Sequence, residues 1–295
     1  MSALVQGVSR PGVVGPWLRG RWRAAGYAGM RVILVAITLY ILMALLGPLI
    51  WGKSPLAVHL SDVLKSPSGS HPFGTDEYGR DVLARFLSGA RLSLALGVGA
   101  VAGGALIGLV VGAFIGYVGR SIDTVVSRAL DGILAFPALI LGMAFGLGIG
   151  AGGLSATLAV GIAGVPWYAR VVRSEVLSLR SREFIDAERA LGAKRGRILR
   201  RHVIPSVLGG LTVQASLGVA YAVLAIAGLG FLGLGVRPPT PEFGAMITEG
   251  RDYLTSGQWW ISIFPGIGLL MLVGLSMALG EALRDQMDPY GKLSY

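Results

Sequence analysis

Long apolar blocks alternate with shorter polar segments along this chain. Five blocks contain no charged residue, at 32–51, 92–118, 132–169, 206–235 and 258–280. Because a helix needs about 20 apolar residues to cross a bilayer, four blocks fit one crossing each. The block 132–169 is too long for one helix, and its glycine-rich run 146–153 can turn the chain, so we predict crossings at 132–150 and 154–172. The pattern predicts an all-α integral membrane protein with about six transmembrane helices.

The composition agrees with a chain that lies mostly in lipid. Of 295 residues, 53% are hydrophobic and 14% are charged, whereas soluble domains carry about 25% charged residues. Mean hydropathy is +0.67. The chain has no cysteine, which excludes a disulfide framework and a thiolate metal site.

The net charge of +10 is unevenly distributed. Between Arg170 and Arg201 there are ten Lys or Arg against four Asp or Glu, and no acidic residue precedes Asp62. Because basic loops stay on the cytoplasmic side, we expect the N-terminus, the segment 173–205 and, after six crossings, the C-terminus to be cytoplasmic. The charge is thus assigned to membrane topology, and we expect no nucleic-acid partner.

The basic segment 1–30 precedes the first crossing, and residues 31–295 form the predicted transmembrane domain. The segment combines glycine, proline and two tryptophans with arginine. Two structures remain open for it, an interfacial segment on the inner membrane surface or a poorly ordered tail.

The longest charged stretch, residues 178–210, must fold in water or at the membrane surface, and its pattern predicts two short helices. Ser181 can cap the first, and Glu183 and Asp186 fall in its first turns, where negative charge suits the helix dipole. Helical spacing gives this helix a largely apolar face, which comprises Phe184, Ile185, Ala187, Glu188 and Leu191.

Glycine and proline punctuate the rest of this stretch. Gly192 can adopt the left-handed conformation that ends the first helix. The second helix places Ile198 on an apolar side, with basic residues around it. Pro205 has no N–H donor and suits the first turn of the next helix.

Two further patterns involve glycine. Gly104, Gly108, Gly112 and Gly116 recur at every fourth position, a small-residue stripe that lets another helix approach closely. In the polar segment 52–91, Gly74 and Gly79 can form turns. Neighbouring Thr75, Asp76, Arg80 and Asp81 either cap and pair locally or contact a solute; we favour the local structural role.

Catalytic and relay groups are absent from the apolar blocks, which contain Ser, Thr, Tyr and Gly but no Asp, Glu, Lys, Arg or His. Proton-coupled carriers place ionisable residues at membrane depth. The run 47–54 matches a phosphate-loop pattern, but it ends a membrane helix and Pro55 follows it. We therefore expect no enzyme and no cofactor in this chain, so energy must come from a partner or the chain is a passive pore.

Two motifs resemble those of ABC importer permeases. The run Asp186-Ala187-Glu188, then Gly192, then Ile204-Pro205 has the spacing of their EAA loop. Asp186 replaces the leading Glu of that motif and Glu188 its second Ala, while His202 and Ile204 replace its Ile and Leu. The run HPFGTDEYGRDVL at 71–83 resembles the GTDxxGRDVLxR segment of dipeptide, oligopeptide and nickel importer permeases, and the similarity covers roughly 30–295.

This resemblance implies the type I importer permease fold and the C-type permease of the dipeptide and oligopeptide systems, in the bacterial inner membrane. It implies a cytoplasmic coupling helix, in a loop over about 178–206, that contacts an ATPase. The residues it assigns to this coupling loop are Phe184, Asp186, Ala187, Glu188, Leu191, Gly192, Ala193, Ile198 and Pro205. Its implied partners are a second related permease, two cytosolic subunits that bind ATP and Mg, and an extracytoplasmic substrate-binding protein.

Other functions remain open beside peptide import. The same permease class serves nickel, and a passive channel or secondary carrier would need no ATPase. A membrane enzyme or an assembly scaffold is disfavoured, because no catalytic group lies at membrane depth. The charged loop itself could form a basic hairpin on anionic lipid instead of a coupling helix.

Overall fold

The computed structural model describes residues 16–287 of the chain. Within them the structure is helical, with no strand, and a π-helical turn, η2, covers Leu199–Val203. The α-helices are α1 (Pro16–Trp51), α2 (Val82–Val118), α3 (Arg120–Leu134), α4 (Ala138–Ile149), α5 (Gly153–Arg180), α6 (Glu183–Ala190), α7 (Arg195–Ile198), α8 (Ile204–Phe231), α9 (Phe243–Gly250) and α10 (Trp260–Met287). Of the predicted basic segment 1–30, residues 1–15 lie outside the described residues.

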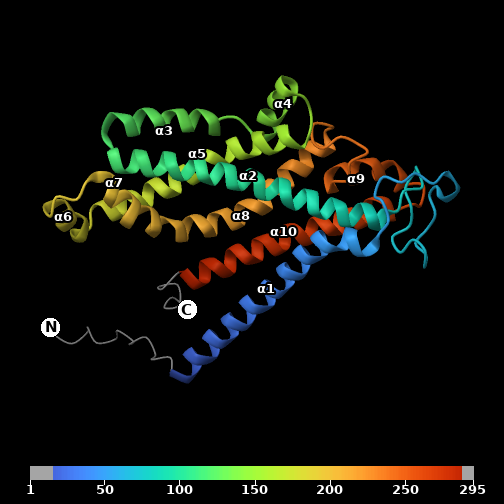
Figure 1. The fold of residues 1–295 in the computed structure, drawn as a ribbon, viewed down its shortest axis with the longest axis horizontal. Helices are drawn as coiled ribbons and strands as arrows, with labels where there is room; N and C mark the ends of the chain where they lie inside the picture. The colour runs from blue at the N-terminus through green and yellow to red at the C-terminus, as the bar shows by residue number, and fades with distance from the viewer. Residues whose placement is uncertain (1–15, 288–295) are drawn as a thin grey trace, which may run out of the picture.

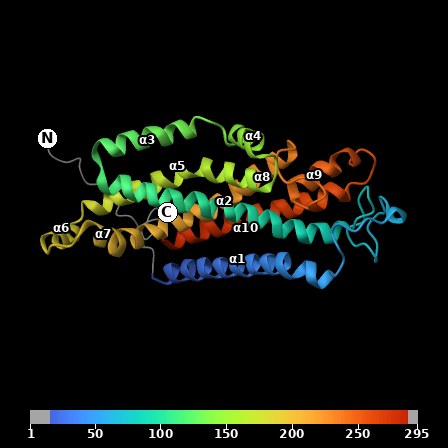
Figure 2. The ribbon, with the colours of Figure 1, turned by 45° about the horizontal axis from the view of Figure 1, so that its top comes forward.

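The long helices lie side by side in an elongated bundle (Figures 1 and 2). The segment 52–81 and α9 lie at one end, which we call the loop end, and α6 and α7 lie at the other, the α6 end (Figure 1). The start of α1 and the end of α10 both point towards the α6 end (Figure 1). The start of α1, the loop that carries α6 and α7, and the end of α10 therefore lie towards the same end of the bundle (Figure 1).

Among the described helices, α2 and α5 share the most extensive contact, and they meet along the glycine stripe. A Cβ atom at Gly104 would lie 2.6 Å from the carbonyl oxygen of Gly161, and one at Gly112 would lie 2.4 Å from that of Ala169. At Gly108 the nearest atom would be the Tyr168 Cβ, at 2.5 Å. Only glycine permits these approaches, since real Cβ contacts are longer.

Five helices in residues 16–287 are long and apolar enough to cross a membrane. A sixth crossing would consist of α3 and α4 together, which are bent by 85°. The crossing predicted at 132–150 is therefore not one continuous helix, because the chain breaks between the end of α3 and the start of α4. Pro137 explains the break, because proline disfavours helical backbone at the residue before it and donates no hydrogen bond.

The short polar segment 119–131 lies between the second and third apolar blocks, and its polarity predicts a loop; in the structure it instead forms most of α3. Its two acidic residues face α5. Asp123 forms a bidentate pair with Arg173, at 2.5 and 2.6 Å, and Asp131 pairs with Arg170. These contacts hold α3 alongside α5. The apolar residues Ile122, Val125, Val126, Ala129 and Leu130 recur at helical spacing, a signal that the prediction overlooked.

Candidate functional site

The loop at the α6 end begins with a helix that the sequence located well. Glu183 and Asp186 lie in the first turn of α6, where the helix dipole favours them. The predicted cap is wrong, however. The Ser181 hydroxyl donates to the Ser178 carbonyl oxygen at 3.0 Å, which directs it back towards α5 rather than to an N–H of α6.

Gly192 ends α6 with a φ of +81°, the left-handed conformation that glycine adopts without steric cost. The N–H of Ala193 donates to the carbonyl of Glu188 at 3.0 Å, which closes the turn. A Cβ atom at Gly192 would meet nothing within 4 Å. The requirement for glycine at this position is therefore conformational and not a matter of space.

The predicted second helix is continuous with the following crossing. The single turn α7 leads into the π-helical turn η2 and then directly into α8. Pro205 lies in the first turn of α8, and the N–H of Ile204 donates to Leu199, five residues back. A π turn suits this place, because a proline clashes with the carbonyl four residues before it in a regular α-helix.

Burial divides the loop into an anchored side and an exposed side. Ile185 and Ile198 are fully buried in the main apolar cluster, and Ala193 packs against it. Leu191 is 85% exposed and Phe184 43% exposed, while Asp186, Ala187 and Pro205 are also on the surface. The loop thus exposes apolar side chains on its outer side while two isoleucines fix it to the bundle.

At the loop end, Gly74 and Gly79 form tight turns with φ of +72° and +71°. A Cβ atom at Gly79 would lie 1.9 Å from the His59 carbonyl oxygen. Between the two turns, the Thr75 carbonyl accepts a hydrogen bond from the Trp260 indole at 3.0 Å, which ties this segment to the start of α10.

A buried charge network joins the segment 52–81 to α2 and α9. Arg80 Nε lies 2.5 Å from Asp76 Oδ2, and Arg85 Nη2 lies 2.5 Å from Glu249 Oε2. Arg85 also contacts Asp76, at 3.4 Å, and donates to the Pro239 carbonyl at 3.1 Å. These side chains mainly bind one another, so their geometry supports a structural role for the Asp76–Asp81 motif.

Burial shifts the pKa values of two carboxyl groups in this network. Burial raises the pKa of the Glu249 carboxyl, although Arg85 and Arg80 act against it. Burial also raises the pKa of Glu77, whose Oε2 is buried without a hydrogen-bond partner. The network therefore concentrates carboxyl groups that gain a proton more readily than exposed ones.

Asp81 has a separate function as the N-cap of α2. Its Oδ1 accepts the N–H of Ala84 at 2.9 Å and the indole N–H of Trp51 at 3.1 Å. Lys53 Nζ and His71 Nδ1 lie 3.1 and 2.8 Å from Oδ2. Burial acts to raise the pKa of Asp81, but these hydrogen bonds and the Lys53 charge outweigh it and lower the pKa.

Sequence reasoning missed Arg85 and Glu249. Arg85 is the last residue of the GTDxxGRDVLxR pattern, and its side chain is 1% exposed. Its position in the motif was the signal that could have singled it out. Glu249 carried no such signal, because it lies 164 residues further along the chain.

We expect Arg85→Met to destabilise the protein by about 3 kcal/mol, because removing one partner of a buried pair leaves the other charge uncompensated. Thermal unfolding of the purified protein in detergent measures this. Arg91→Met, at an exposed position of the same helix, is the matched control. Glu249→Gln added to Arg85→Met should recover part of the loss, and equal melting temperatures for all variants would contradict the prediction.

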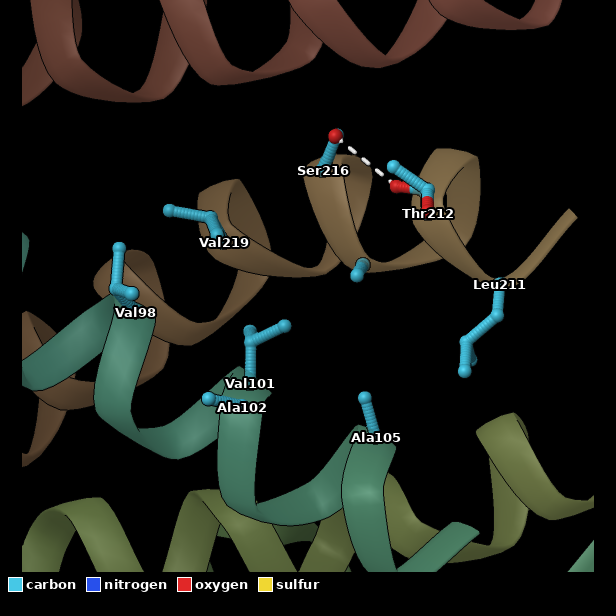
Figure 3. Close-up of a pocket in the computed structure, with 9 residues that line it drawn as sticks. Val98, Val101, Ala102, Ala105, Leu211, Thr212, Ser216 and Val219 are labelled. Carbon is cyan, nitrogen blue, oxygen red and sulfur yellow. Dashed lines mark hydrogen bonds between the residues drawn. The ribbon is translucent and has the colours of Figure 1, made fainter. Parts of the chain in front are cut away.

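An apolar pocket of about 340 Å³ opens between α2 and α8 (Figure 3). Val101 and Ala105 of α2 face Leu211 of α8 across it (Figure 3). The hydroxyls of Thr212 and Ser216 donate to carbonyls one turn back in their own helix, at 2.7 and 3.0 Å. The lining is therefore apolar and carries no charged group that could select a solute.

Comparison with known proteins gives a consistent set of similarities. A model of the family described as binding-protein-dependent transport system inner membrane component matches residues 85–289. The dipeptide transport system permease protein DppC of Alkalihalophilus pseudofirmus is 43% identical over 257 residues, 87% of this chain and 84% of the relative. The nickel transport system permease protein NikC of Escherichia coli is 36% identical over 275 residues, 93% of this chain and 96% of the relative.

The fold is similar to that of a chain in the MetNI methionine ABC transporter, solved in inward-facing conformations. The TM-score is 0.56 at 24% identity, over 69% of this chain and 96% of that chain. This similarity concerns the fold alone. It agrees with the type I importer permease fold that the sequence motifs implied.

Proposed function

The chain belongs to the family of binding-protein-dependent transport system inner membrane components, a multi-pass permease of the ABC importer class, and on this premise we propose that it forms half of a membrane pathway for di- and oligopeptides. The observation that carries the proposal is the similarity to dipeptide permeases over 87% of the chain. Nickel import by the same class is the second candidate, supported by the relative of that function at 36% identity.

We assign the coupling function to the loop at the α6 end. Force from a partner must reach the bundle through a firm contact, and the buried Ile185 and Ile198 provide one. The exposed Phe184 and Leu191, together with Ala187 between them, give an apolar surface on which an ATPase can bind. Burying such surface on association is favourable by about 25 cal/mol per Å².

The proposed assembly contains this chain, a second related permease, two cytosolic ATPases that carry ATP and Mg, and an extracytoplasmic binding protein. ATP hydrolysis takes place in the partner subunits, and the permease supplies the pathway. The positive-inside rule supports an orientation with both termini and the α6 end in the cytoplasm and the loop end outside. This orientation directs the exposed apolar surface of α6 towards the ATPases.

Purification of the tagged chain from its host tests the proposal. We expect an ATPase to copurify, and deletion of the chain to abolish uptake of labelled dipeptides. Mass spectrometry of ligand carried by the copurified binding protein identifies the substrate. Persistent dipeptide uptake after deletion, or a binding protein loaded only with nickel, would reject peptide import, and absence of any ATPase would reject the importer.

A further inference from the structure

Two departures from the EAA motif lie next to each other in space. Glu188 stands where that motif has its second alanine, and His202 stands where it has isoleucine. The two are 14 positions apart by number (202 − 188), yet Glu188 Oε1 lies 3.2 Å from His202 Nε2. The His202 ring also packs edge-on against Phe184, with centroids 6.0 Å apart.

The contact joins two different parts of the coupling loop. Glu188 lies near the end of α6, and its carbonyl closes the turn at Gly192. His202 lies in the π-helical turn η2, at the base of α8. The pair therefore bridges the open side of a hairpin whose corner is Gly192.

The exposed fraction of the two side chains limits how much their contact can stabilise the fold. The Glu188 and His202 side chains are 36% and 29% exposed, and polar pairs of such exposure contribute little to folding stability. The buried Ile185 and Ile198 already hold the loop to the bundle. Apolar contacts are not directional. The two buried isoleucines therefore do not by themselves determine the rotation of α6 about this anchor.

We propose that Glu188 and His202 are positioning residues, which together set the orientation of α6 relative to α8 for its contact with the ATPase. The proposal rests on the coupling function assigned above. A polar pair here replaces the alanine and isoleucine of the motif, and it functions only when both members are present. When only one of the two residues is replaced, the other keeps its polar side chain but loses the partner that it contacts.

A double-mutant cycle measures this dependence. The variants are Glu188→Ala, His202→Ile and the two combined, with Glu183→Gln as a matched removal of a charge from the same helix. In the reconstituted complex we expect each single change to lower the stimulation of ATP hydrolysis by loaded binding protein about threefold, as suits an exposed pair. The combined variant, which restores the motif residues, should recover most of the stimulation.

Orientation itself is measured without transport. The chain has no cysteine, so spin labels at Ala190→Cys, an exposed position in α6, and Leu208→Cys report the distance between α6 and α8 in the purified complex. We expect the single variants to broaden this distance distribution, and the exchanged pair Glu188→His with His202→Glu to narrow it again.

The two measurements separate the failure of this proposal from that of the coupling function. Distance distributions that are identical in all variants, or single-variant losses that simply add in the double variant, would overturn the positioning proposal. Absence of stimulation in the unmodified complex would overturn the coupling function, while the distances would still decide whether the pair orients α6.

Discussion

Replacing Gly112 with leucine is expected to prevent assembly of the protein. Even a single Cβ atom there would lie 2.4 Å from the Ala169 carbonyl oxygen and 2.9 Å from the Val172 Cβ. Both obstacles belong to α5 and one is backbone, so the side chain cannot rotate away from them. Overpacking of a tight core costs about 1–3 kcal/mol, and separating two helices along their contact costs more.

A control for this change lies on the same helix. A Cβ atom at Gly103 would meet nothing within 4 Å, so Gly103→Leu adds equal bulk and equal helix propensity without a clash. We expect normal yield of purified complex for Gly103→Leu and almost none for Gly112→Leu, measured by affinity purification and gel filtration. A normal yield for Gly112→Leu would show that α2 and α5 can separate without consequence.

Ala187→Arg and Gly192→Val are expected to abolish uptake while the chain remains inserted in the membrane. Ala187 is exposed, so the arginine fits in the isolated chain but adds charge and bulk to the surface proposed to contact the ATPase. At Gly192, φ is +81°, a conformation that is strained for a β-branched residue. The turn must then change, and α6 with it.

The interpretation as a lipid-bound hairpin predicts the reverse pattern. On that view these two changes are mild, and loss of charge at Arg195, Arg197 and Arg200 is severe. Uptake and ATPase copurification are measured for both sets in parallel, with membrane fractionation to verify insertion. Full transport in Ala187→Arg and Gly192→Val, with loss only in the arginine variants, would refute the coupling function of α6.

Local features of the structure were predictable because their causes are local. A glycine that ends a helix, as at Gly192, or permits a tight turn, as at Gly74 and Gly79, acts through its own backbone dihedrals. The crossings formed by α1, α2, α5, α8 and α10 follow from block length and hydropathy. In each case the residues that decide the outcome are neighbours in the sequence.

Features that depend on distant partners were not predictable. The helical spacing of the apolar residues in 119–131 was available in the sequence, but the packing of this segment on α5 through Asp123 and Arg173 was not. Arg85 was marked by its place in the motif, but its buried partner Glu249 was not, because it lies 164 residues further along the chain. The predicted Ser181 cap failed for a local reason: α6 begins at Glu183, and the Ser181 hydroxyl donates to its near neighbour Ser178 at the end of α5.

The glycine contacts between α2 and α5 have a mechanical consequence. Because their backbones are in close contact along successive turns, the two helices cannot slide or roll independently and must move as one rigid unit. At 37 residues, α2 is roughly 55 Å long at the α-helical rise of about 1.5 Å per residue. It begins at the charge network of the loop end, while α5 leads into α6. If α6 receives the push of an ATPase as proposed, that push would reach the opposite end as a tilt of the whole helix pair.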